Sequence, residues 1–284
     1  MTPTSASRDP WFDRPIVVLS PPRSGSTLLF ETLARAPGLY TIGGESHALM
    51  EGLAALHPAH NGWQSNRADA DTATPGLVDL LRQRFLGALR DRDGQPPRAV
   101  PLRLLEKTPK NSLRIPLLQR VFPEAHFVYL YREPRQVLSS MIEAWNSGRF
   151  RTYPRLPDWA GTPWALVLVP GWRDLIGKPL HEIVAAQWEI TTRILLDDLA
   201  GVAPERRSVV RYEDLLADPQ ATMTRLCQRV QLDWDVTLDG QLPTSRFTVS
   251  KPDAEKWRRH ETEINAVLPA LQATLQRAEA FASA

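Results

Sequence analysis

Cysteine is almost absent from this sequence, because Cys227 is the only one among its 284 residues. A single cysteine cannot form an internal disulfide, so a hydrophobic core must hold the fold together, and a chain of this length can supply one. The composition fits a reducing compartment. We expect Cys227 itself to be a small buried hydrophobe on a helix.

Long apolar runs and charge of one sign are lacking as well. The tail from Met1 to Asp13 has no apolar stretch, and the run 166–169 is too short to cross a bilayer. The sequence therefore predicts no secretory signal and no membrane span, and we expect a cytoplasmic protein. With 34 basic and 32 acidic residues the net charge is +2, which argues against non-specific binding to nucleic acid or to a membrane surface. Any anion site must be local.

The apolar residues that are present predict strands alternating with helices. Short β-rich runs predict strands at 16–19, 102–105, 126–131 and 208–211. Helical spacing predicts helices at 27–33, 77–89, 115–121, 134–145, 180–199, 219–230 and 255–276. This alternation predicts one α/β domain over 1–284, with a central, mostly parallel sheet flanked by helices. Ligands of such sheets gather at the carboxyl ends of the strands.

The loop from Pro21 to Thr27, with the sequence PPRSGST, joins the first strand to the first helix. The loop offers one glycine and three hydroxyls, and the helix that follows favours an anion through its free N–H groups and its dipole. Arg23 can add positive charge. The loop lacks the lysine of the GxxxxGK[ST] pattern, and no obvious carboxylate is placed to hold magnesium, so it does not indicate a nucleoside-triphosphate site. Its position alone also allows an ordinary turn.

A second candidate anion site follows the strand at 126–131. Arg132 comes directly after this strand, and Ser140 lies about two turns into the next helix. A guanidinium and a hydroxyl placed in this way can grip one phosphate together. The alternative is an ion pair between Arg132 and Glu133 or a neighbouring carboxylate, with Ser140 merely facing a helix. Tyr212 is a further candidate contact or a packing residue.

The order of four segments resembles the sulfotransferase family, especially the tyrosylprotein sulfotransferases and related bacterial enzymes. These segments are VVLSPPRSGSTLL, EKTPK, FPEAHFVYLYREPRQVLSSM and RYEDLLADP. The resemblance implies a P-loop-NTPase-like three-layer fold and the cosubstrate 3′-phosphoadenosine 5′-phosphosulfate (PAPS), with no metal. It implies transfer of a sulfuryl group to a hydroxyl acceptor, either a small molecule or a peptide, including a phenol or a peptide tyrosine. The oligomeric state stays open.

The same resemblance assigns donor contacts to residues of this chain. The loop that binds the 5′-phosphosulfate in the family corresponds here to Arg23, Ser24, Gly25, Ser26 and Thr27. The resemblance implies that Arg132 and Ser140 bind the 3′-phosphate. Ser245 and Lys251 match residues that touch the donor phosphates in the tyrosylprotein group, although this basic stretch also fits a solvated surface.

The resemblance also implies two catalytic groups, a base for the acceptor proton and a cation for the leaving oxygen. Glu45 falls where the tyrosylprotein enzymes carry a catalytic glutamate, and His47 is its rival because other branches use histidine. Lys107 stands 25 positions before Arg132, which is the separation of the family's catalytic lysine. Arg23 is expected to share the task of Lys107. Lys110 is a weaker candidate for this cation and is expected to be solvated.

Tryptophan, proline and glycine concentrate between Trp145 and Trp188. We expect the segment at about 145–180 to form a loop or lid on the acceptor side, and its aromatic residues favour an apolar or aromatic acceptor. A satellite core that holds a long loop is the equal alternative. Two other functions remain open, namely a P-loop kinase acting on a small molecule and a non-catalytic module that binds adenosine bisphosphate.

Overall fold

A central parallel sheet organises the fold, which is described by a computed structural model for residues 9–243, 247–250, 253 and 255–283. Within these residues the strand order is β2-β3-β1-β4-β7, and each neighbouring pair is parallel. The strands span Leu39–Tyr40 (β2), Arg103–Lys107 (β3), Ile16–Leu19 (β1), His126–Tyr131 (β4) and Arg207–Arg211 (β7). The predicted parallel sheet is confirmed. The apolar pattern missed only β2, a short strand at its edge.

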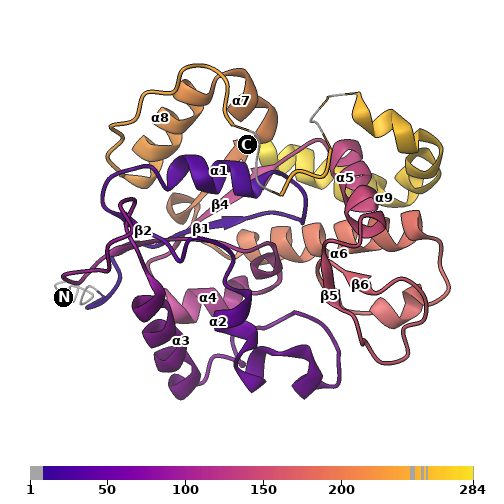
Figure 1. The fold of residues 1–284 in the computed structure, drawn as a ribbon, viewed down its shortest axis with the longest axis horizontal. Helices are drawn as coiled ribbons and strands as arrows, with labels where there is room; N and C mark the ends of the chain where they lie inside the picture. The colour runs from indigo at the N-terminus through magenta and orange to yellow at the C-terminus, as the bar shows by residue number, and fades with distance from the viewer. Residues whose placement is uncertain (1–8, 244–246, 251–252, 254, 284) are drawn as a thin grey trace, which may run out of the picture.

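The alternating side chains of β1 divide the core between the two faces of this sheet. Ile16 and Val18 pack on one face, which is covered by α1, α7 and α8, spanning Ser26–Leu33, Tyr212–Ala217 and Pro219–Val230. Val17 and Leu19 pack on the other, which is covered by α3, α4 and α6, spanning Pro75–Ala88, Ile115–Val121 and Leu180–Ala200. Figure 1 shows α1 and α8 on one side of the sheet and α3 and α4 on the other. The predicted three-layer fold is confirmed.

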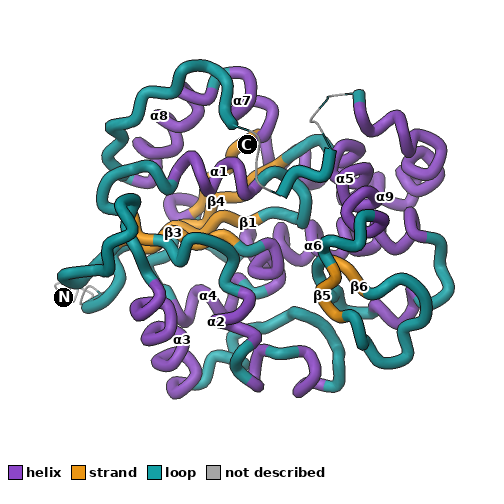
Figure 2. Tube along the Cα trace, viewed as in Figure 1, coloured by secondary structure: helices purple, strands orange, loops and turns teal. Residues whose placement is uncertain are grey.

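A second hydrophobic cluster lies around one end of α6, on the side of the molecule away from β3 (Figure 2). Its elements are α5, β5, β6 and α9, which span Pro134–Asn146, Arg151–Tyr153, Trp164–Ala165 and Glu261–Ala282. Four tryptophans of the tryptophan-rich segment are buried in this cluster: Trp145, Trp164, Trp172 and Trp188. Of the two interpretations of that segment, the satellite core is therefore correct for these four side chains.

Two local predictions are resolved by the same packing. Cys227 lies on α8 with 1% of its surface exposed, as expected of a small buried hydrophobe. The helix expected at 255–276 divides into a 3-10 turn, Lys256–His260, and α9. Trp257 in the 3-10 turn packs into the second cluster.

Candidate active site

Parallel strands bring distant loops together, because their carboxyl ends meet at one edge of the sheet. The loops after β1, β2, β3, β4 and β7 all reach a cavity of about 910 Å³. The predicted site residues that line this cavity are Arg23, Gly25, Ser26, Thr27, Glu45, His47, Arg132, Ser140 and Tyr212. Ser24 and Lys107 are buried and are not among the lining residues. Ser245 and Lys251 lie outside the described residues.

The loop between β1 and α1 is shaped by its own side chains. The hydroxyl of Ser24 donates to the carbonyl of Pro21 over 2.9 Å, so it holds the turn and does not face the cavity. Gly25 has a φ of 94°, and a Cβ at this position would lie 2.3 Å from Cε2 of Tyr212. Only glycine tolerates both this φ and this close approach. Tyr212 therefore packs against the loop, and it also lines the cavity.

The N-terminus of α1 presents hydrogen-bond donors to the cavity. A helix leaves its first N–H groups without internal partners, and its dipole favours an anion at that end. Among the described residues, Leu28 is the first of α1 whose N–H meets a backbone carbonyl, that of Gly25 at 2.9 Å. Ser26 and Thr27 precede it and line the cavity. This helix end can hold the oxygens of a phosphate-like group.

Arg132 adds positive charge beside the helix end. Its guanidinium donates to the carbonyl of Arg23 over 3.3 Å and to Oε1 of Gln136 over 3.0 Å, and it stacks on the ring of Tyr212 at 4.4 Å. The predicted alternative, an ion pair with Glu133, is wrong, since no carboxylate in the described part of the chain lies within ion-pair distance of Arg132. Burial lowers the pKa of this guanidinium. Arg132 thus carries a half-buried charge that forms no ion pair with a carboxylate of the described residues, although Glu213 and Glu133 lie near enough to oppose the shift.

Arg23 likewise has a half-buried guanidinium that forms no ion pair among the described residues. Its Nε lies 3.4 Å from Oγ of Ser140, another nitrogen donates to the carbonyl of Phe247 over 2.9 Å, and the group stacks on Phe150 at 4.5 Å. Burial and the neighbouring charge of Arg132 lower its pKa to about 10. Neither guanidinium has a carboxylate partner among the residues described, so an anion placed beside them would relieve their mutual repulsion.

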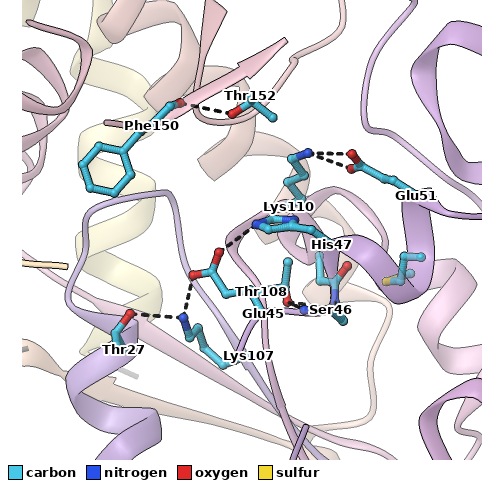
Figure 3. Close-up of polar contacts among 12 residues, drawn as sticks. Thr27, Glu45, Ser46, His47, Glu51, Lys107, Thr108, Lys110, Phe150 and Thr152 are labelled. Atoms are coloured by element: carbon cyan, nitrogen blue, oxygen red, sulfur yellow. Dashed lines mark hydrogen bonds and ion pairs between the residues drawn. The ribbon is translucent and has the colours of Figure 1, made fainter. Parts of the chain in front are cut away.

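Glu45 stands between Lys107 and His47 (Figure 3). Its Oε1 accepts from Nζ of Lys107 over 2.6 Å, and its Oε2 lies 2.7 Å from Nε2 of His47. Lys107 is 1% exposed and also donates to Oγ1 of Thr27 over 3.1 Å. Burial favours the neutral form of Glu45, but the contacts with His47 and Lys107 outweigh it and lower the pKa of Glu45 to about 2. The structure thus joins both candidate bases, the candidate cation and the donor loop.

Lys110 is buried, so the expectation that it is solvated is wrong. Its Nζ donates to both carboxylate oxygens of Glu51 and to the hydroxyl of Tyr153, each over 2.8 Å. Arg114 donates to Glu51 over 2.8 Å. Burial lowers the pKa of Lys110 to about 8, although Glu51 opposes the shift. Glu51 lies 59 residues away from Lys110 in the chain, so sequence spacing gave no signal of this pair.

Four apolar residues of the second cluster line the cavity: Phe150, Leu166 and Val167 from the segment at 145–180, and Trp257. The N–H of Leu166 donates to the carbonyl of Phe150 over 3.2 Å, so these two lining residues are held together. Leu166 has a φ of 63°, an unusual conformation for a bulky residue and one that clusters at functional sites. The aromatic composition of the segment at 145–180 indicated its tryptophans as acceptor-side residues. Phe150, Leu166 and Val167 were not predicted as lining residues from the sequence.

The described residues contain neither a candidate membrane span nor a candidate metal site. No helix there is both long enough and apolar enough to cross a membrane. No group of three or more histidine, cysteine, aspartate or glutamate side chains in those residues could hold a metal ion.

Known proteins resemble this chain over much of its length. Residues 15–236 match the profile described as the sulfotransferase family. The chain is 23% identical over 219 residues to protein-tyrosine sulfotransferase 2 of Gallus gallus, which covers 76% of this chain and 51% of that protein. It is 29% identical over 126 residues to the omega-hydroxy-beta-dihydromenaquinone-9 sulfotransferase of Mycobacterium tuberculosis, covering 44% of this chain and 28% of that protein. The chain spans about half or less of these relatives.

The fold has a solved counterpart. The sulfotransferase domain of the Synechococcus olefin synthase aligns with a TM-score of 0.52 at 24% identity, over 97% of this chain and 96% of that domain. This likeness supports the three-layer fold and leaves the chemistry to be argued from the site.

Proposed function

This chain belongs to the sulfotransferase family, and from that premise we propose that it transfers the sulfuryl group of PAPS to a hydroxyl acceptor. One observation carries the proposal. Arg23 and Arg132, two half-buried guanidinium groups without carboxylate partners among the described residues, line the same cavity as Glu45, whose carboxylate holds the buried Lys107 behind it. The two arginines suit a donor that carries phosphate on both the 3′ and the 5′ position of its ribose. The Glu45–Lys107 pair suits chemistry at the sulfur of that donor.

In this proposal the donor binds along the carboxyl edge of the sheet. The 5′-phosphosulfate lies at the N-terminus of α1, held by its N–H groups and by Arg23. The 3′-phosphate lies against Arg132 and Ser140. Two contacts support this placement: Ser140 contacts the side chain of Arg23, and Arg132 donates to the backbone carbonyl of Arg23. A nucleotide without the 3′-phosphate leaves the charge of Arg132 unbalanced.

The proposed reaction is an in-line displacement. The acceptor oxygen forms a bond to sulfur while the bond from sulfur to the bridging phosphate oxygen breaks. Adenosine 3′,5′-bisphosphate leaves with the electron pair, and the acceptor proton passes to Glu45. Lys107 stabilises the charge that grows on the bridging oxygen, and Arg23 shares this task. Positioning and electrostatics supply most of the catalysis, as they do in phosphoryl transfer.

Lys107 links the donor to the base in this scheme. Its Nζ contacts both Glu45 and Thr27 of the donor loop. When the bridging oxygen attracts the ammonium group, Glu45 loses one of the two partners that lower its pKa and becomes a stronger base. His47 keeps the carboxylate oriented. His47 is also the second candidate base, because a carboxylate at 2.7 Å could orient its ring for the same proton transfer.

The acceptor in this proposal carries its hydroxyl on an apolar or aromatic body, as a phenol or a peptide tyrosine does. Phe150, Leu166 and Val167 supply an apolar wall. A phenol, with a pKa of about 10, also suits a weakly basic carboxylate better than an aliphatic alcohol does. The names of the two relatives point to different acceptors, a protein tyrosine and a menaquinone derivative, so the lining residues are the better guide.

Nucleotide preference separates the proposal from a P-loop kinase. We expect isothermal calorimetry to show tight binding of adenosine 3′,5′-bisphosphate in excess chelator, with much weaker binding of 5′-AMP and of ATP. Tight binding of ATP that requires magnesium, with no preference for the bisphosphate, would contradict the proposal and favour the kinase. Transfer of the sulfuryl group then separates the enzyme from a non-catalytic module that only binds the bisphosphate.

A further inference from the structure

Glu106 is a buried carboxyl group directly beside Lys107 on β3. It is 1% exposed, and its Oε1 accepts from the hydroxyls of Ser46 over 2.7 Å and of Thr108 over 2.6 Å. Its Oε2 has no hydrogen-bond partner among the described residues. Burial raises the pKa of Glu106, although the hydrogen bonds from Ser46 and Thr108 oppose the shift. Such a group costs free energy in a core, so its presence calls for a physical reason.

Glu106 and Lys107, which are neighbours on β3, contact two neighbouring residues of the loop after β2. Lys107 holds Glu45, while the residues on either side of Lys107 hold Ser46, the next residue after Glu45. The backbone N–H of Ser46 donates to Oγ1 of Thr108 over 2.7 Å, and the side chain of Ser46 is fully buried. The consecutive residues 106–108 at the end of β3 therefore hold Glu45 and Ser46 in the loop after β2.

We propose that Glu106 is a positioning residue that fixes Ser46, and thereby sets the carboxylate of Glu45 against Lys107. The inference rests on the proposed function, because it assigns to Glu106 the alignment of the base. Glu106 does not line the cavity, and the donor loop reaches Lys107 through Thr27. Donor binding should therefore not depend on it, whereas turnover should.

The pH dependence of turnover reports this alignment separately from stability. The charged or titratable groups that act on Glu45 are His47 in its own loop, Lys107 on β3, Arg23 in the donor loop and Lys110 after β3. If the loop relaxes, Glu45 moves from Lys107 and His47, and its pKa rises toward the ordinary value. The acid limb of the kcat profile then moves to higher pH.

The test compares Glu106→Gln with Ser46→Ala and with the double variant. A misplacement of about 1 Å can cost on the order of 10²-fold, so we expect Glu106→Gln to lower kcat by about ten-fold to a hundred-fold. The KM for the acceptor and the Kd of adenosine 3′,5′-bisphosphate should stay unchanged, and the acid limb should shift upward. Ser46→Ala should add little in the Glu106→Gln background, because both changes break the same linkage.

Asp9→Asn is the matched control, since Asp9 is a carboxylate with 9% side-chain exposure that pairs with Arg82 and does not line the cavity. It should lower Tm without changing kcat. If Glu106→Gln does not fold, Ser46→Ala and Thr108→Val carry the same test. An unchanged kcat, a kcat loss matched by lost bisphosphate binding, or additive effects of the two substitutions would overturn the inference. Absence of transfer by the wild type contradicts the proposed function instead.

Discussion

Nζ of Lys107 lies 2.6 Å from Oε1 of Glu45, although 62 residues separate the two in the chain. Strand pairing explains how they meet. β2 and β3 are parallel neighbours, so the loop after β2, which carries Glu45, and the end of β3, which carries Lys107, reach the same edge of the sheet. Thr27 in the donor loop accepts from the same Nζ over 3.1 Å. One ammonium group thus links the candidate base to the candidate donor site.

Glu45→Gln should abolish most turnover while leaving nucleotide binding intact. The amide keeps the shape of the side chain but cannot take the acceptor proton, so kcat should fall by about 10²–10⁴-fold. The Kd of adenosine 3′,5′-bisphosphate, measured by calorimetry, should change little. His47→Asn is the companion variant, and its loss should be smaller because His47 orients the base. A nearly active Glu45→Gln beside an inactive His47→Asn would reverse the two roles.

Arg132→Ala should weaken the binding of nucleotides that carry a 3′-phosphate. The loss of a hydrogen bond between charged groups is worth about 1.5–3 kcal/mol, so adenosine 3′,5′-bisphosphate should bind correspondingly less tightly. Binding of 5′-AMP should hardly change. Arg193→Ala is the control, because Arg193 is paired with Glu189 on the surface of α6. Equal losses for both nucleotides would show that Arg132 does not read the 3′-phosphate.

Gly25→Ala should damage the donor loop. The added Cβ would lie 2.3 Å from Cε2 of Tyr212 at a residue whose φ is 94°, so the loop or the ring must shift. Both the affinity for the bisphosphate and Tm should fall. Gly87→Ala is the control, since a Cβ there meets no heavy atom within 4 Å and the residue lies in the last turn of α3, so neither nucleotide affinity nor Tm should fall. Unchanged nucleotide affinity in Gly25→Ala would show that this close approach does not shape the donor site.

Glu51→Gln should lower stability in a pH-dependent way. The change leaves Lys110 and Arg114 buried without their carboxylate, which should cost about 3–5 kcal/mol in urea unfolding near neutral pH. Burial alone would raise the pKa of Glu51, but the two cations lower it to about 2, below the ordinary value. Its contribution is therefore present above the ordinary glutamate pKa of about 4.3 and is lost as pH falls toward 2.

The difference in unfolding free energy between the wild type and Glu51→Gln should accordingly shrink as pH falls through this range. Glu182→Gln, which breaks the exposed pair between this residue of α6 and Lys178 just before the helix, should cost no more than about 0.5 kcal/mol. A difference that stays constant from neutral pH to pH of about 2 would contradict the assigned pKa shift.

Much of the sheet could be predicted from the sequence because its strands are local apolar runs. The strands Ile16–Leu19 and His126–Tyr131 and the helix Ile115–Val121 have the predicted bounds. β2 was missed because a strand of two residues carries no periodic pattern. The position of the site could be predicted from the sheet, because parallel strands bring the loops at their carboxyl ends to one edge.

The pairing of buried polar side chains could not be predicted. Nothing local in the sequence indicates that Lys110 meets Glu51, or that Glu106 meets Ser46, because these contacts depend on how separate loops fold over the ends of neighbouring strands. Composition likewise indicated the tryptophans of the segment at 145–180 as the residues facing the acceptor, whereas Phe150 and Leu166 of that segment line the cavity. The roles proposed at this edge of the sheet come from the resemblance to the sulfotransferase family, and only the fold revealed which side chains contact one another.

The most direct test is the fate of the sulfuryl group. Purified protein is incubated in excess chelator with PAPS labelled in its sulfur, together with simple phenols, tyrosine peptides and an extract of its own organism. Mass spectrometry then follows the label and the adenosine 3′,5′-bisphosphate released. We predict a sulfated hydroxyl product formed in equal amount with the bisphosphate, and its loss in Glu45→Gln. Binding of the bisphosphate with no labelled product from any acceptor, or equal product from wild type and Glu45→Gln, would contradict this mechanism.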